Sequence, residues 1–288
     1  MTDNTTASWA TLGRTSPAAL EPARLQAHHA AQWAARVARS YLEPVPDDSH
    51  TALCWDPAVG ALVTASLAGQ GGPVRLGLRV ADLTLSLFEP DGTAAVTLPL
   101  DGRTDTDVLA FLKAALTTLG HDPERLALDL PYDLPDHPVV SGAAYDVQGA
   151  RDGLAELARY FANAAILLDD VARQPGASPV RCWPHHFDIA VLIAIDQGGD
   201  PETDRSIGVG LSPGDETYAE PYLYVTPWPY PEAAALSGLT AGGQWHTQGF
   251  VAAIATASGV MLGEAGEART RGFVDEAIAA CKTVLGAS

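Results

Sequence analysis

The chain has little positive charge. Lys and Arg together number 17 against 35 Asp and Glu, so the formal net charge at pH 7 is −18. A field of that sign repels the phosphates of nucleic acids and the headgroups of anionic membranes. The composition therefore argues against a nucleic-acid or a membrane partner.

Cysteine is also scarce. The three cysteines, Cys54, Cys182 and Cys281, lie far apart and form no C-x-x-C pair. An odd and widely spaced set does not fit a disulfide framework, and it suits a reducing compartment.

Long apolar runs and targeting signals are missing as well. Residues 1–15 are polar and lack both a basic n-region and an apolar h-region, so we predict no signal peptide. No apolar run approaches the ~18 residues that a membrane-spanning helix needs. We therefore expect a soluble, cytoplasmic protein.

Compact catalytic motifs are lacking too. The sequence contains no H-E-x-x-H and no G-x-S-x-G, and the glycines of residues 69–72 match neither a P-loop nor a dinucleotide fingerprint. Ser212 is followed by Pro213, which does not suit a nucleophile elbow. Cys182 lies beside Trp183 and two histidines, but a strand-borne cysteine is more often a small buried side chain.

What is present is a regular alternation of helix and strand patterns. Apolar spacing predicts helices at residues 16–43, 104–119, 150–174, 249–262 and 267–285. Short strands are expected at 51–55, 61–67, 74–80, 83–88, 93–98, 126–130, 186–195, 207–212 and 220–227. Turn residues between the strands indicate antiparallel meanders, so the predicted fold class is α+β, with antiparallel sheet packed against long helices.

The predicted elements fall into two similar halves with the order helix, strands, helix. A flexible N-terminal tail (1–15) precedes an N-terminal α+β half (16–130), a Pro-rich connector (131–149) and a C-terminal α+β half (150–288). The first strand of each half carries Cys-Trp, at residues 54–55 and 182–183. An old duplication is one explanation, and coincidence is the other.

One stretch, Arg181 to Ala190, places two histidines and a carboxylate beside a hydrophobic strand. Because ionisable side chains are costly to bury without partners, such a placement draws attention to the site. Side chains alternate across a strand, so His186 and Asp188 should share the face opposite to the apolar one. His185 should then point the other way, which assigns it a structural or strand-entry role.

The next two strands extend that second face. Gly208 and Gly210 place no side chains on this face, and we call this part of the sheet the glycine floor. Glycine within a strand often marks the close approach of a ligand or another backbone. Around this floor we expect a ligand-binding pocket on the C-terminal sheet, and its predicted residues are His186, Asp188, Ser212, Glu220, Tyr222 and Tyr224. The alternative is that the glycines admit a packed helix and that the tyrosines are ordinary half-buried aromatics.

Four residues also form a candidate metal set. His186, Asp188, Glu220 and His246 are ligand types for Zn or Mn, the divalent metals that we consider as cofactors. His28 and His29 on the first helix are a further pair, which we interpret as core or interface histidines bonded to backbone carbonyls.

The segment from Ser178-Pro179-Val180 to Phe187-Asp188-Ile189-Ala190 resembles the S-P-V…F-D-L-A segment of a bacterial domain family of unknown function. The Tyr-rich Glu220-Pro221-Tyr222-Leu223-Tyr224 resembles a later part of that family, and the likeness spans most of the chain. Serine can stand at the position of His186 in the family, which weakens the metal interpretation. The family has no established activity that the resemblance could imply.

The sequence thus leads to a small-molecule-binding or enzymatic protein and leaves open which of the two it is. Two alternatives stand beside it: a metal-dependent, hydrolase-like enzyme, and a non-catalytic interaction module. The aromatic and Pro-rich residues 224–231 would form the partner surface, with a homodimer as one outcome.

Overall fold

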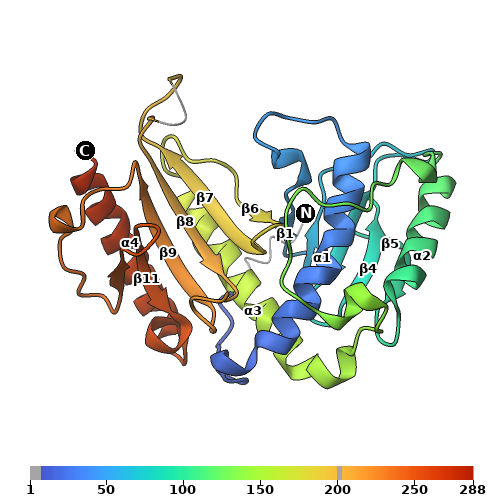
Figure 1. Cartoon of the computed structure of the whole chain (residues 1–288), viewed down its shortest axis with the longest axis horizontal. Helices are drawn as coiled ribbons and strands as arrows, with labels where there is room; N and C mark the ends of the chain where they lie inside the picture. The colour runs from blue at the N-terminus through green and yellow to red at the C-terminus, as the bar shows by residue number, and fades with distance from the viewer. Residues whose placement is uncertain (1–7, 200–202, 288) are drawn as a thin grey trace, which may run out of the picture. The chain divides into compact units, whose positions relative to one another are not determined.

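The computed structural model describes residues 8–199 and 203–287. It contains long helices and two antiparallel sheets of five and six strands, so the predicted α+β fold class is confirmed (Figure 1). By its internal contacts the chain divides into two units. Unit 1 comprises Met1–Ala19, Arg159–Val180 and Asp188–Ser288, and unit 2 comprises Leu20–Ala158 and Arg181–Phe187.

Unit 2 contains the N-terminal helix and the first meander. Its helices are α1 (Glu21–Tyr41), α2 (Asp105–Thr118) and the first part of α3 (Val147–Val171). Its strands are β1 (Cys54–Asp56), β2 (Ala61–Val63), β3 (Arg75–Arg79), β4 (Thr84–Phe88), β5 (Ala94–Pro99) and β6 (Arg181–Trp183). The five-stranded sheet has the order β1-β2-β3-β4-β5, with every neighbouring pair antiparallel. The predicted meander is therefore confirmed.

Helix α1 is buried on nearly every side, although its sequence predicts a single apolar stripe. The stripe residues His29, Trp33 and Val37 are buried, but so are Gln32 and His28 on other faces. Many of the remaining buried positions are alanines, which let neighbouring segments approach the helix closely. A helix buried all round belongs to the core of its unit rather than to its surface.

Unit 1 contains the second part of α3, α4 (Gly266–Val284) and five strands: β7 (Asp188–Ala194), β8 (Ser206–Ser212), β9 (Tyr222–Trp228), β10 (Gln244–His246) and β11 (Ala252–Thr256). The six-stranded sheet has the order β10-β11-β9-β8-β7-β6. Val191, Val209 and Val225 lie opposite one another across β7, β8 and β9, and both strand pairs are antiparallel, so the predicted meander is confirmed here as well. Helix α4 packs against β9 and β8.

Two secondary-structure predictions are wrong. Residues 249–262 form β11 and a short π-helical turn, Ala257–Met261, instead of a helix. The alanines favour a helix locally, but Ala253 and Ala255 pair with Val225 and Leu223 of β9, and tertiary pairing overrides the weak local propensity. Residues 126–130 form no strand.

The predicted domain limits and the division by contacts do not coincide. The division falls within α3, between Ala158 and Arg159, and it places the whole of the predicted connector in unit 2. Of the predicted N-terminal tail, residues 1–7 lie outside the described part of the chain. Ala10 exchanges two hydrogen bonds of 2.8 Å with the side chain of Asn163, and Leu12 is 3% exposed.

The order helix, strands, helix occurs twice, as α1, β1–β5, α2 and again as α3, β6–β11, α4. Cys54-Trp55 opens β1, and Cys182-Trp183 closes β6. A duplication stays a prediction. Among the described residues, no helix combines the length and apolar character needed to cross a bilayer.

Candidate ligand-binding cavity

The predicted face of the unit 1 sheet has the expected side-chain parity. Ile189, Val191 and Ile193 are buried on one side of β7, and Leu192 on the other side is 49% exposed. Asp188 begins the strand and is buried, whereas His186 lies in the turn 184–187 before it. Strand alternation therefore does not determine where His186 points.

Tyr224 occupies half of the predicted glycine floor. Its hydroxyl donates a hydrogen bond to Asp188 Oδ2, and its ring lies where a Cβ on Gly210 would be. Near Gly208 such a Cβ would meet only Thr226 Cβ, at 4.0 Å. The glycine at Gly210 thus accommodates a neighbouring tyrosine, and the floor at Gly208 is open.

The other predicted ligand-binding residues are engaged in turns. Tyr222 donates to Asp215 Oδ2 at 2.5 Å, and burial raises the pKa of this tyrosine. Ser212 Oγ accepts from the backbone N–H of Gly214 at 3.2 Å. Glu220 accepts two hydrogen bonds of 2.7 Å from Ser258. These contacts fix the loops at one end of the sheet.

The four candidate metal ligands do not form a donor cluster. His246 Nδ1 lies 2.9 Å from the Tyr218 hydroxyl, Nε2 lies 2.7 Å from the Gln248 carbonyl oxygen, and the ring stacks on Phe250. Within residues 8–199 and 203–287, no three His, Cys, Asp or Glu side chains are grouped so that they could hold a metal ion. The described donors therefore give no support to the metal-dependent enzyme.

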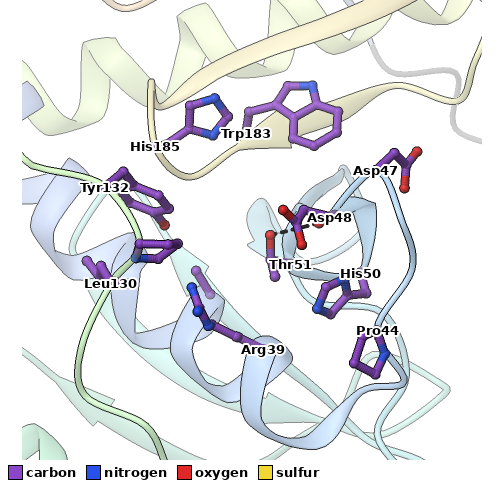
Figure 2. Close-up of a pocket in the computed structure, with 12 residues that line it drawn as sticks. Arg39, Pro44, Asp47, Asp48, His50, Thr51, Leu130, Tyr132, Trp183 and His185 are labelled. Carbon is purple, nitrogen blue, oxygen red and sulfur yellow. Dashed lines mark hydrogen bonds between the residues drawn. The ribbon is translucent and has the colours of Figure 1, made fainter. Parts of the chain in front are cut away.

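A cavity of about 580 Å³ lies within unit 2 (Figure 2). Four segments line it: Ala35 and Arg39 of α1, residues of the following loop 44–51, the connector residues 130–132, and Trp183 with His185. Its volume falls in the range of sites for small organic ligands.

Three rings form one wall of the cavity. His185 lies 5.6 Å from Tyr132 and 6.1 Å from Trp183 between ring centroids. Burial, with a further contribution from neighbouring His186, lowers the pKa of His185. Burial also raises the pKa of Tyr132 to about 12. At neutral pH this wall is therefore uncharged, and it suits a planar apolar group.

Hydrogen bonds behind the wall hold these rings in place. The Tyr132 hydroxyl donates to Gln32 Oε1 at 2.9 Å, and Gln32, which is 0% exposed, donates to the Pro184 carbonyl oxygen at 2.8 Å. His28 Nε2 lies 2.8 Å from the same oxygen. Both helix residues thus anchor the turn that carries His185, so the cavity wall is formed before a ligand arrives.

Two residues with left-handed backbone lie in the cavity lining or close to it in the sequence. Asp48 has φ 55° and Phe187 has φ 57°, in the left-handed region that residues other than glycine rarely adopt. Asp48 lines the cavity, and Phe187 closes the turn after His185, where its ring stacks on His28 at 5.2 Å. Strain of this kind tends to persist where it serves a site.

The polar part of the lining combines a hydroxyl, an imidazole and charged groups. Thr51 Oγ donates to the Asp48 carbonyl oxygen at 2.9 Å. His50 Nδ1 accepts weakly from the Val45 N–H at 3.4 Å. Arg39, Asp47 and Asp48 supply charges of both signs.

Sequence reasoning missed most of this cavity. It singled out His185 but assigned it a structural or strand-entry role, and it did not select Arg39, Asp48 or Tyr132. A signal exists in the aromatic residues beside proline, Pro131-Tyr132 and Trp183-Pro184, which lie in segments without periodicity. Comparison of the chain with family models, curated proteins and solved structures gave no match.

Proposed function

We propose that this protein binds a small organic molecule in the cavity of unit 2. The observation that carries the proposal is the ring-lined cavity of about 580 Å³, whose wall is fixed by buried Gln32 and His28. A preformed, partly aromatic cavity with a few converging polar groups is the usual form of a small-molecule site. Because the side chains of such a wall are ordered before the ligand binds, binding loses less conformational entropy, and this favours affinity.

The sheet face of unit 1 is the second place for a ligand. Its support is the open floor at Gly208 beside exposed Leu192. Its polar side chains are already bonded within the loops, as described for Tyr222 and Glu220. We therefore rank it below the cavity.

An interaction role has separate support in the segment after β9. Tyr230 is 45% exposed, and its ring packs edge-on against Trp228 at 5.0 Å. Exposed aromatic residues of this kind are common at partner surfaces. A homodimer formed through residues 224–231 is the partner that we consider for this surface.

A fragment screen by thermal shift tests the cavity. We expect hits that raise the melting temperature of the wild type and of Trp55→Leu but leave Trp183→Leu unshifted. Trp55 is the matched control, because it too is a half-buried tryptophan that follows a cysteine on a short strand of unit 2. Hits that stabilise all three proteins equally would place the ligand elsewhere, and a diverse screen without hits would refute the proposal.

A further inference from the structure

Among the residues that the structure describes, Arg39 is the one Lys or Arg that lines the cavity. It lies in the last turn of α1, it is half-buried, and it makes no hydrogen bond or ion pair with a described residue. Its position also suits the negative end of the helix dipole. A guanidinium that is partly removed from water and has no partner is a ready binding group for a carboxylate.

Asp48 offers the opposite charge on another wall. Figure 2 shows its carboxylate turned toward the interior of the cavity, across from Tyr132. No described residue bonds to this carboxylate, whereas neighbouring Asp47 Oδ1 accepts from the Ser49 N–H at 3.1 Å. Asp47 thus shapes the loop, and Asp48 is available to a ligand cation.

The three rings that line the cavity add an apolar surface to these two charges. Trp183, His185 and Tyr132 offer faces and edges to a flat apolar group, and the Tyr132 hydroxyl is engaged with Gln32. The cavity therefore combines a planar apolar subsite, an unpartnered cation and an unpartnered anion within one volume.

We infer that the ligand of this cavity is a zwitterion with a planar apolar side group, the chemistry of an aromatic α-amino acid. The carboxylate of the ligand pairs with Arg39, its ammonium group pairs with Asp48, and its ring packs against Trp183 and Tyr132. This inference rests on the proposed function and specifies the class of ligand. A singly charged molecule would leave one of the two charges without a partner, and a neutral molecule would leave both.

Four related probes separate the contributions of the two charges. L-tryptophan carries both charges, tryptamine only the ammonium, indole-3-propionate only the carboxylate, and indole neither. In calorimetric titrations of the full chain we expect L-tryptophan to bind at least about tenfold more tightly than each of the others, as hydrogen bonds to charged groups imply.

Two variants test which residue pairs with each charge of the ligand. Arg39→Gln should lower the affinity for L-tryptophan to that for tryptamine, and Asp48→Asn should lower it to that for indole-3-propionate. Exposed Arg151→Gln and Asp136→Asn are the matched controls, and we expect both to bind as the wild type does.

The outcomes distinguish the inference from the proposed function. The zwitterion inference would be overturned, with the cavity still binding, if the four probes had equal affinities. It would also be overturned if Arg39→Gln lost as much affinity for indole as it lost for L-tryptophan. Fragments of other classes that bind where all four probes fail would overturn it as well. If no compound of any class binds the cavity, the proposed function itself fails.

Discussion

At the scale of the residue, His28 shows how the ligand cavity and the stability of unit 2 depend on the same side chains. Its imidazole lies between Phe187 and His29, and Nε2 is 2.8 Å from the Pro184 carbonyl oxygen. Burial lowers the pKa of His28 to about 4, the Pro184 bond opposes this shift, and His29, Arg24 and His186 add to it. The interpretation of His28 as a core histidine bonded to a backbone carbonyl is confirmed.

This shift predicts that unit 2 loses stability in mild acid. The unfolded chain takes up a proton on His28 near pH 6.5, whereas the folded chain does so only near pH 4. The contribution is therefore complete above pH 6.5, and it is lost as the pH falls toward 4, with a magnitude on the order of 3 kcal/mol. Chemical unfolding at pH 7 and at pH 4.5 measures it.

The variant His28→Gln should show a smaller loss of unfolding free energy between these two pH values, because it removes the titrating group and keeps a donor for Pro184. His121→Gln, at a half-buried histidine whose Nε2 lies 2.6 Å from the Ala68 carbonyl oxygen, is the control and should behave as the wild type does. A pH dependence that is unchanged in His28→Gln would contradict the assignment.

At the scale of the element, strand β8 contrasts two glycines that sequence alone cannot tell apart. A Cβ on Gly210 would meet the ring of Tyr224 and, at 2.9 Å, the carbonyl oxygen of Ile189. A Cβ on Gly208 would meet only Thr226 Cβ at 4.0 Å. The two positions lie two residues apart on the same face of one strand.

We expect Gly210→Ala to lower the free energy of unfolding by about 2 kcal/mol, because overpacking forces ring and backbone to shift. We expect Gly208→Ala to change it by less than about 0.5 kcal/mol. Paired denaturation curves measure the difference. Equal effects of the two substitutions would mean that Tyr224 does not occupy the floor at Gly210.

Element-scale patterns also show what periodicity can predict. The spacing of apolar residues predicted α1, α2, α3, α4 and most strands because each of those patterns depends on one face of one element. It failed at 249–262, where a run of small residues fits both a helix and a strand. There the partner strand β9, distant in sequence, decided the structure.

At the scale of the whole molecule, the site depends on segments that only the fold brings together. Arg39, Asp48, Tyr132 and Trp183 come from four separate stretches, two of them without regular structure. Local patterns carry no information about which loops meet. The sequence did direct attention to the segment 181–190, although its two histidines proved to lie in a turn before the strand.

The homodimer is a prediction about the whole molecule. If residues 224–231 mediate it, the wild type should sediment as a dimer and Tyr230→Ser as a monomer, because truncation of an exposed aromatic anchor weakens such surfaces. Analytical ultracentrifugation at micromolar concentration measures this. A monomeric wild type would remove the homodimer from the account.

The most direct test of the cavity uses the six tryptophans of the chain as reporters. We would label the protein with 5-fluorotryptophan, assign the Trp183 resonance with Trp183→Phe, and titrate L-tryptophan and indole while recording fluorine NMR spectra. The account predicts a saturable shift of the Trp183 resonance, larger than those of Trp228 and Trp245 in unit 1. A saturable shift confined to Trp228 or Trp245, with Trp183 unmoved, would contradict it.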